Sequence, residues 1–172
     1  MISIIEKMRS YATIPWERIP DLGLYKDQVI TYIERLYSPL YGEQAQRLLT
    51  PSMINNYVKI GVIARPDGKK YGREQLAMLT MLVVLKQANS IEDVARLMNS
   101  EKDEGVRAVY EAFCAYLVES LRSYADRLEA ANASALHLAV GAAVSSLACE
   151  SMLSTASPAA AEAEKKKKAP AQ

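Results

Sequence analysis

Hydrophobic residues recur at intervals of three and four along most of the chain, and this spacing predicts a mainly helical protein. The first clear stripe predicts a helix over about residues 25–37, and we expect Pro39 to end it. Residues 1–23 carry two prolines and are expected to be extended. From Arg73 to Leu85 the chain is apolar nearly all the way round, which is typical of a helix enclosed by other elements.

The second half of the chain predicts longer helices. Ser90 and Asp93 resemble a capping box, which would begin a helix that continues through Met98. After Gly105 one apolar stripe reaches Leu128, and residues 134–153 form a second, alanine-rich helical run. The two helices would form an antiparallel hairpin within the chain or pair across a dimer. Residues 130–149 carry no formal charge, but their polar composition favours a close-packed buried helix over a membrane span.

A short helix with strong boundary signals lies between these regions. Thr50 followed by Pro51 is typical of an N-cap and first helical position, and Gly61 suits a helix end that needs a positive φ. These signals predict a helix over residues 51–60. The segments 62–65 and 69–71 flank a Pro-Asp-Gly turn sequence, which predicts a small two-stranded hairpin.

The polar face of this short helix is suited to nucleic acid. On a helical wheel, its polar arc consists of Ser52, Asn55, Asn56 and Lys59. Asparagine can pair with the edge of adenine, serine can bind base or phosphate, and lysine neutralises phosphate. The distribution of charge along the chain also favours nucleic acid at this helix. Residues 50–74 contain five basic and two acidic groups, whereas residues 101–172 contain eight basic and ten acidic groups. The candidate DNA-binding residues of the hairpin region are Arg65, Lys69, Lys70, Tyr71 and Arg73.

The order of helix, loop, short helix, tight basic hairpin and helix matches a winged helix-turn-helix. The stretch Thr50-Pro51-Ser52-Met53-Ile54-Asn55-Asn56-Tyr57-Val58-Lys59-Ile60-Gly61-Val62-Ile63 resembles the recognition helix of the MerR superfamily. Residues 65–71 look like a shortened wing, and Ser90-Ile91-Glu92-Asp93-Val94 is similar to the start of the family's following helix. The resemblance implies a fold that is mainly α: a MerR-like winged helix-turn-helix with a small two-stranded wing, followed by a C-terminal helical hairpin.

A closer resemblance covers roughly residues 14–98. Asp27-Gln28-Val29, residues 53–59, Lys69-Lys70-Tyr71 and Leu85-Lys86-Gln87 resemble bacterial proteins grouped as domain of unknown function 1836, which are regarded as MerR-like. The chain departs from the MerR pattern at Asn55 and Asn56, where those regulators commonly place arginine and an aromatic residue. It also has no counterpart of their long dimerising coiled coil or metal-binding cysteine loop.

The remaining composition points away from catalysis. The 172 residues carry a net charge of +1, so only a local surface could attract nucleic acid. His137 has no carboxylate or cysteine at metal-ligand spacing, and the glycines never cluster into a phosphate-binding loop. Cys114 and Cys149 fall within apolar helical faces. We therefore expect a protein that is not an enzyme and that uses no metal and no cofactor.

The domain organisation and function follow from these patterns. We expect a DNA-binding winged helix-turn-helix domain over residues 1–100, a helical dimerisation or effector region over 101–155, and a disordered lysine-rich tail over 156–172. The expected function is that of a cytoplasmic, sequence-specific transcriptional regulator, which binds double-stranded DNA as a homodimer. We expect no membrane partner, and the sequence is compatible with an unidentified small-molecule effector. The alternative is a protein-interaction module on a winged scaffold that has lost DNA binding.

Overall fold

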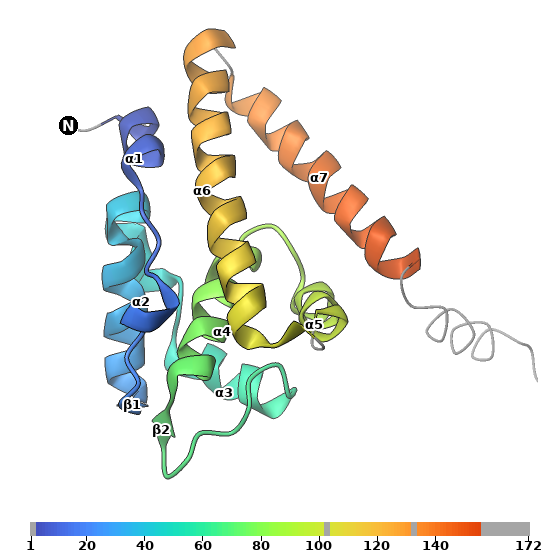
Figure 1. The fold of residues 1–172 in the computed structure, drawn as a ribbon. Helices are drawn as coiled ribbons and strands as arrows, with labels where there is room; N and C mark the ends of the chain where they lie inside the picture. The colour runs from blue at the N-terminus through green and yellow to red at the C-terminus, as the bar shows by residue number, and fades with distance from the viewer. Residues whose placement is uncertain (1–2, 102–103, 132–133, 156–172) are drawn as a thin grey trace, which may run out of the picture.

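A computed structural model describes residues 3–101, 104–131 and 134–155 of the chain. Within these residues the protein is mainly helical, as the sequence predicts, with one small antiparallel sheet (Figure 1). The α-helices are α1 (Ile4–Ser10), α2 (Lys26–Tyr41), α3 (Pro51–Lys59), α4 (Arg73–Leu85), α5 (Ile91–Ser100), α6 (Val106–Ala131) and α7 (Ala135–Thr155). The strands are β1 (Leu24–Tyr25) and β2 (Lys70–Tyr71), and short 3-10 turns cover Trp16–Arg18 and Gly42–Arg47. The predicted lysine-rich tail lies outside the described residues.

Helix α4 forms the centre of the core. Leu76, Leu79 and Leu82 are fully buried, which confirms the prediction that this run is enclosed by other elements. Helices α2 and α6 pack against α4, and α3 packs against α2. The hydroxyl of Tyr37 on α2 donates a hydrogen bond of 2.8 Å to the carbonyl of Thr80, which ties α2 to the middle of α4.

The N-terminal segment departs from the extended chain that we expected. Residues 4–10 form α1, because Ser3 and Glu6 make a capping box: the Glu6 amide donates to Ser3 Oγ, and the Ser3 amide donates to Glu6 Oε2. Helix α1 packs against α6. Arg9 fastens the two helices together, since its Nη2 lies 2.7 Å from Asp126 Oδ1 and 2.5 Å from Glu129 Oε2.

Helix α2 runs past Pro39, so the predicted end of this helix is wrong. Proline cannot donate to the carbonyl of Arg35, four residues earlier, and this missing bond is the usual reason for a break. Here the hydroxyl of Ser38 donates to that carbonyl at 3.2 Å instead. The helix therefore continues to Tyr41 and ends at Gly42, whose φ is +59°.

The predicted hairpin between segments 62–65 and 69–71 is also wrong in its pairing. Strand β2 pairs with β1, so that Leu24 faces Tyr71 and Tyr25 faces Lys70. Segment 62–65 forms no strand because the side-chain amide of Gln75 donates to the carbonyls of Ala64 and Arg65, both at 3.0 Å. The approach of β1 requires a glycine, since a Cβ on Gly23 would lie 2.8 Å from Lys70 Cβ.

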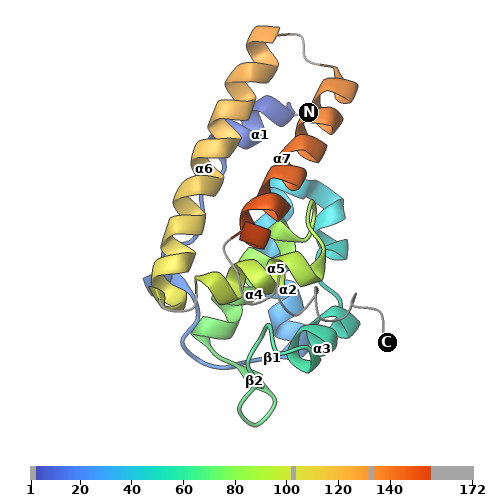
Figure 2. The ribbon, with the colours of Figure 1, turned by 90° about the vertical axis from the view of Figure 1, so that its right-hand side faces the viewer.

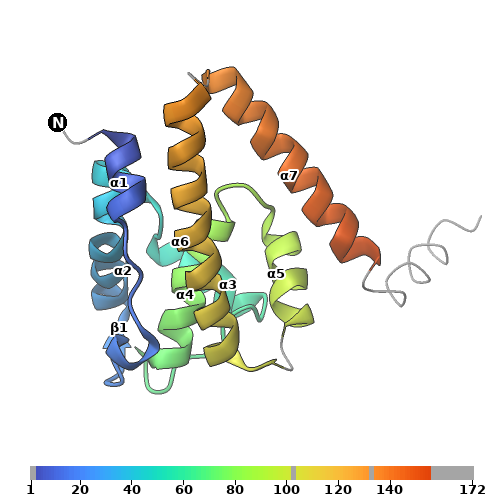
Figure 3. The same ribbon diagram turned by 45° about the horizontal axis from the view of Figure 1, so that its top comes forward.

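Helices α6 and α7 do not pack along each other as the predicted hairpin requires. They are consecutive in sequence but diverge from their junction at the top of Figure 1, and Figures 2 and 3 show the same separation from two other directions. The apolar stripe of α6 is covered by α1 and α4 instead, and Tyr110 in this stripe is buried. Its hydroxyl donates to the carbonyl of Ile14 at 2.7 Å.

Helix α7 packs only lightly, against α5. It is not the close-packed buried helix that we expected, because Leu136, Val140, Val144 and Leu147 are between 54% and 74% exposed. By length and composition, residues 135–154 could cross a membrane: their mean hydropathy is 1.4, and none of this window is buried inside the described chain.

Candidate nucleic-acid interface

The boundaries of α3 are fixed by local hydrogen bonds at both ends. Thr50 Oγ1 accepts from the amide of Met53 at 3.3 Å, and Pro51 occupies the first turn, as the sequence predicts. At the other end Gly61 has a φ of +79°, and its amide donates to the carbonyl of Val58 at 3.2 Å. The amide of Val62 donates to the carbonyl of Tyr57 at 3.0 Å, which completes a Schellman motif. These caps make α3 a nine-residue helix, one residue shorter than predicted.

The two faces of α3 divide as the sequence predicts, with one exception. Ile54 and Tyr57 are buried in the core. The polar arc of the helix is exposed and consists of Ser52, Asn55, Asn56 and Lys59. Ile60, which the helical wheel places on the apolar arc, is 46% exposed because the chain turns away from the core at Gly61. The helix therefore offers its whole polar face to a partner.

The two asparagines of α3 differ in their surroundings. Lys26 Nζ, at the first position of α2, donates to Asn55 Oδ1 at 2.6 Å. This bond orients the Asn55 amide and places a cation beside the polar face. Asn56 makes no side-chain hydrogen bond to another described residue. Sequence reasoning did not identify Lys26, because it precedes Asn55 by 29 positions and no local pattern connects the two.

The loop between α3 and β2 carries the candidate wing cations. Gly68 and Lys69 have φ values of +51° and +74° between bridge partners Asp67 and Lys70, which is the geometry of a tight type I′ turn. The amide of Lys70 donates to the carbonyl of Asp67 at 2.8 Å. The Lys70 ammonium lies 5.2 Å from the centroid of the half-exposed Tyr25 ring, within the range of a cation–π contact.

A surface hollow joins α3 to this loop. Its lining includes Tyr25, Lys26, Asn55, Lys69 and Tyr71. Three of these residues belong to the predicted site, whereas Tyr25 comes from β1 and Lys26 is the first residue of α2. The turn over residues 67–70 is called the wing turn. The fold brings the polar face of α3, the wing turn and the beginning of α2 together at one end of the molecule, the lower end in Figure 1.

Of the predicted site residues, Tyr71 is buried in the core and Arg73 is bonded to the N-terminal segment. Tyr71 is only 3% exposed, and burial raises the pKa of its hydroxyl. Arg73 Nε donates to the carbonyl of Ile19 at 3.1 Å, and its Nη2 lies 3.7 Å from Asp21 Oδ2. Arg73 thus holds the N-terminal segment in place, and Tyr71 anchors strand β2 in the core. By contrast, the exposed side chains of Lys59, Arg65 and Lys69 form no ion pair with another described residue.

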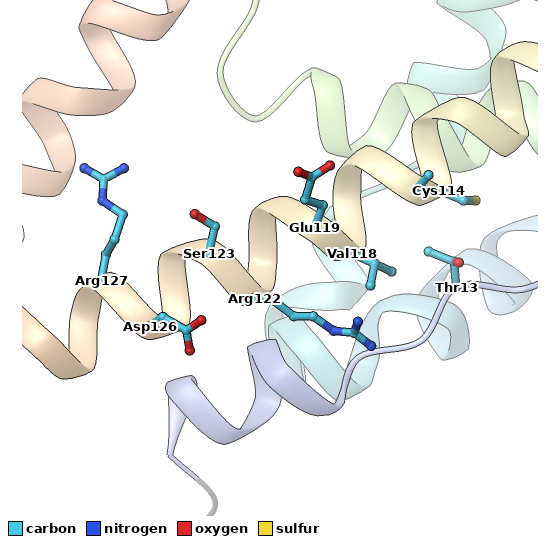
Figure 4. A pocket seen from close by; sticks show the side chains of 9 residues that line it. Thr13, Cys114, Val118, Glu119, Arg122, Ser123, Asp126 and Arg127 are labelled. Carbon is cyan, nitrogen blue, oxygen red and sulfur yellow. The ribbon is translucent and has the colours of Figure 1, made fainter.

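A second hollow lies far from α3, between α6 and the segment after α1 (Figure 4). Its lining mixes Glu119 and Asp126 with Arg122 and Arg127, so it has no dominant charge. Burial raises the pKa of the Cys114 thiol at its end, which disfavours the reactive thiolate. Within the described ranges 3–101, 104–131 and 134–155, no three His, Cys, Asp or Glu residues are grouped to hold a metal ion.

Comparison with known proteins places the chain in a family. Neither the curated proteins nor the solved structures contain a match to it. One family does match, over residues 14–113, and its description is "Domain of unknown function (DUF1836)". The match begins just before Trp16 and ends in the first half of α6, so it includes α3, the wing turn and the whole of α4. The chain is therefore a member of the DUF1836 family, which covers more than half of its length.

Proposed function

We propose that this protein is a sequence-specific transcriptional regulator that binds double-stranded DNA through a MerR-like winged helix-turn-helix. The observation that carries the proposal is the shared surface of α3 and the wing turn. Asn55 from the exposed polar face of α3 and the exposed Lys69 from the turn line one hollow, and both elements lie at the same end of the molecule. Polar side chains that can reach base edges, flanked by cations that can reach phosphates, are the two components of DNA recognition.

Helix α3 would enter the major groove. Nine residues span about 13 Å along the helix axis, which suits an insertion across a groove roughly 12 Å wide. Asn56, whose amide is free of other described partners, would read an adenine edge through its oxygen and nitrogen together. Asn55 would present its NH₂ group, while its oxygen remains bonded to Lys26.

The cations around the hollow would bind the backbone. Lys69 and Lys70 would contact phosphates from the wing turn, with Arg65 nearby, and Lys59 would do so from the end of α3. Lys26 would add a further phosphate contact next to the groove-reading face. Arg73 contributes indirectly, because its bonds to Ile19 and Asp21 hold the N-terminal segment beside the wing.

Selection from fragmented genomic DNA tests this function. The purified protein is incubated with the fragments at low and at physiological salt, and the retained fragments are sequenced. Recovery of a few fragments that share a two-fold motif and survive physiological salt is the expected result. Retention of nothing, or of all sequences at low salt and none at higher salt, would refute sequence-specific binding and favour a protein-interaction module.

Three variants separate base reading from phosphate binding. We expect Asn56→Ala to lose about 1–3 kcal/mol on the selected site and to relax the preference at one base pair. Lys69→Ala should weaken binding to all sequences alike. Arg122→Ala is the matched control, since it removes an exposed positive charge from α6, away from α3 and the turn at Lys69. Equal losses on every sequence for Asn56→Ala and Lys69→Ala would contradict the assignment of α3 as the reading helix.

A further inference from the structure

Helix α7 exposes an apolar surface that nothing in the described chain covers. Its residues 135–149 carry no charged side chain. The face toward α5 is narrow and includes Ser146, Cys149 and Leu153, which are only partly exposed. The remaining surface of the helix is open. A helix that is apolar on nearly all sides is stable in water only when other apolar surface covers it.

Four of the large exposed side chains of α7 form one stripe. Leu136, Val140, Val144 and Leu147 follow one another at intervals of four, four and three residues, so they lie along one face of α7. Their exposed fractions are 74%, 54%, 60% and 67%. Ala139 and Ala143 lie beside this stripe and leave room for a close neighbour.

The stripe reads the same in both directions along the helix. Leucine stands at each end and valine at the two inner positions. When a second α7 lies antiparallel with Leu136 facing Leu147 of the other copy, Val140 and Val144 of the two copies lie within one residue of direct opposition. A two-fold interface requires such a self-complementary patch, because the same surface must serve on both subunits. Antiparallel helix dipoles also attract each other.

A lipid bilayer fits this helix less well. The hydroxyl of Ser146, in the middle of α7, donates to the carbonyl of Ala88 at 3.1 Å. Ala88 lies in the turn between α4 and α5, beside Gln87 and Asn89. If α7 spanned a membrane in this arrangement, these amide side chains and an irregular backbone would lie within the hydrocarbon, where unsatisfied polar groups are costly.

We infer that α7 is the dimerisation surface of this protein and that its partner is the α7 of a second copy, packed antiparallel through the Leu136–Leu147 stripe. This inference depends on the exposed helix alone and not on DNA binding. It therefore stands or fails separately from the proposed function.

Sedimentation equilibrium of the full chain over a wide range of concentration tests the inference. The wild type should approach twice the monomer mass of 19.0 kDa. Val144→Glu places a charge in the stripe of each copy and should weaken the dimer by about a hundredfold or more. Ser145→Glu is the matched control, because it adds the same charge at the next, exposed position on a different face of α7. This control should leave the dimer intact, and circular dichroism should show that both variants keep the wild-type fold.

Cross-linking tests the orientation. In a background with Cys114→Ala and Cys149→Ser, a mixture of Leu136→Cys and Leu147→Cys proteins should form a disulfide-linked heterodimer upon oxidation. A monomeric wild type at all concentrations would overturn the inference, as would equal effects of Val144→Glu and Ser145→Glu. Rapid disulfide formation within Leu136→Cys alone would overturn the antiparallel arrangement. A monomeric protein that floats with phosphatidylcholine vesicles would replace the second copy with a lipid surface and would also overturn it.

Discussion

Lys69 offers a way to separate the stability of the wing turn from its binding of phosphate. Its φ of +74° places an L-residue in the left-handed region, which disfavours every side chain with a Cβ. Lys69→Gly removes both the strain and the positive charge. Lys69→Ala removes the charge but keeps the Cβ, and therefore keeps the strain. The two variants should thus lose the same DNA contact and differ in their free energy of unfolding.

The size of this difference follows from two opposing effects. The left-handed conformation costs a residue with a Cβ roughly 1–2 kcal/mol. Glycine also destabilises the folded protein by about 0.5–1 kcal/mol, because it increases the conformational entropy of the unfolded chain, and this entropy is lost on folding. Lys69→Gly should therefore stabilise the protein by about 0.5–1 kcal/mol relative to Lys69→Ala. In a chain of this size, that difference raises the midpoint of thermal unfolding by about 1–4 °C.

Two measurements on the same samples check the expectation. Thermal unfolding followed by circular dichroism gives the stability of the wild type and both variants. Fluorescence anisotropy with a labelled duplex, repeated across a salt series, gives the affinity and its salt dependence. Loss of one phosphate contact should reduce the slope of log K against log salt by about 0.9 in both variants.

The outcomes discriminate between the two parts of the reasoning. If Lys69→Gly were no more stable than Lys69→Ala, the turn would not have the positive φ on which the argument depends. If the two variants differed from the wild type in stability only, with unchanged salt slopes, Lys69 would not contact phosphate. A stabilised variant with weakened binding would show that the lysine is retained at this position for its charge, at the expense of stability.

Three further changes test the scaffold around the site. Thr50→Ala removes the N-cap of α3 and should lower the free energy of unfolding by about 1 kcal/mol in urea titrations, whereas Thr50→Ser should restore it. Gly23→Ala should separate β1 from β2, because its Cβ would lie 2.8 Å from Lys70 Cβ, and amide exchange should become faster in both strands. Arg9 holds the pKa of Glu129 below its usual value of 4.5, so this contact contributes above that pH and is lost as the pH falls below it; the stability difference between wild type and Arg9→Ala should shrink in acid.

Local signals in the sequence predict α3 well because the interactions that bound it are local. The Thr50 cap, the first-turn proline and the Gly61 exit all act within a few residues, and the structure contains each of them. The start of α1 is also marked locally, since Ser3 and Glu6 stand at capping-box spacing, whereas Pro15 and Pro20 favour an extended chain only further along. The end of α2 was missed because a serine hydroxyl replaces the hydrogen bond that Pro39 cannot make.

The pairing of the wing could not be read from the sequence, because it depends on distant residues. Strand β2 pairs with Leu24 and Tyr25, which lie more than 40 positions earlier in the chain. Gly23 permits this approach, but its role becomes apparent only in the fold, where Lys70 lies beside it. Gln75 satisfies the carbonyls that a hairpin strand would have used. Lys26 belongs to the candidate site for the same reason, because the start of α2 contacts Asn55 in the middle of α3.

The lysines of the candidate interface differ from the arginines that form ion pairs. Every ion pair between described residues is made by an arginine, whereas Lys59, Lys69 and Lys70 are exposed and unpaired with carboxylates. Lysines bind phosphate as point charges with little geometric preference, so they supply affinity rather than discrimination.

Discrimination would then rest on a few base contacts from a single nine-residue helix, which is too little unless two such helices bind together. This reasoning connects α3 to α7. Val144→Glu changes a residue of α7, away from the proposed DNA-binding surface, and should abolish retention of specific fragments at physiological salt while it preserves general binding at low salt. Unchanged specific binding by a demonstrably monomeric Val144→Glu protein would show that one copy reads its site alone.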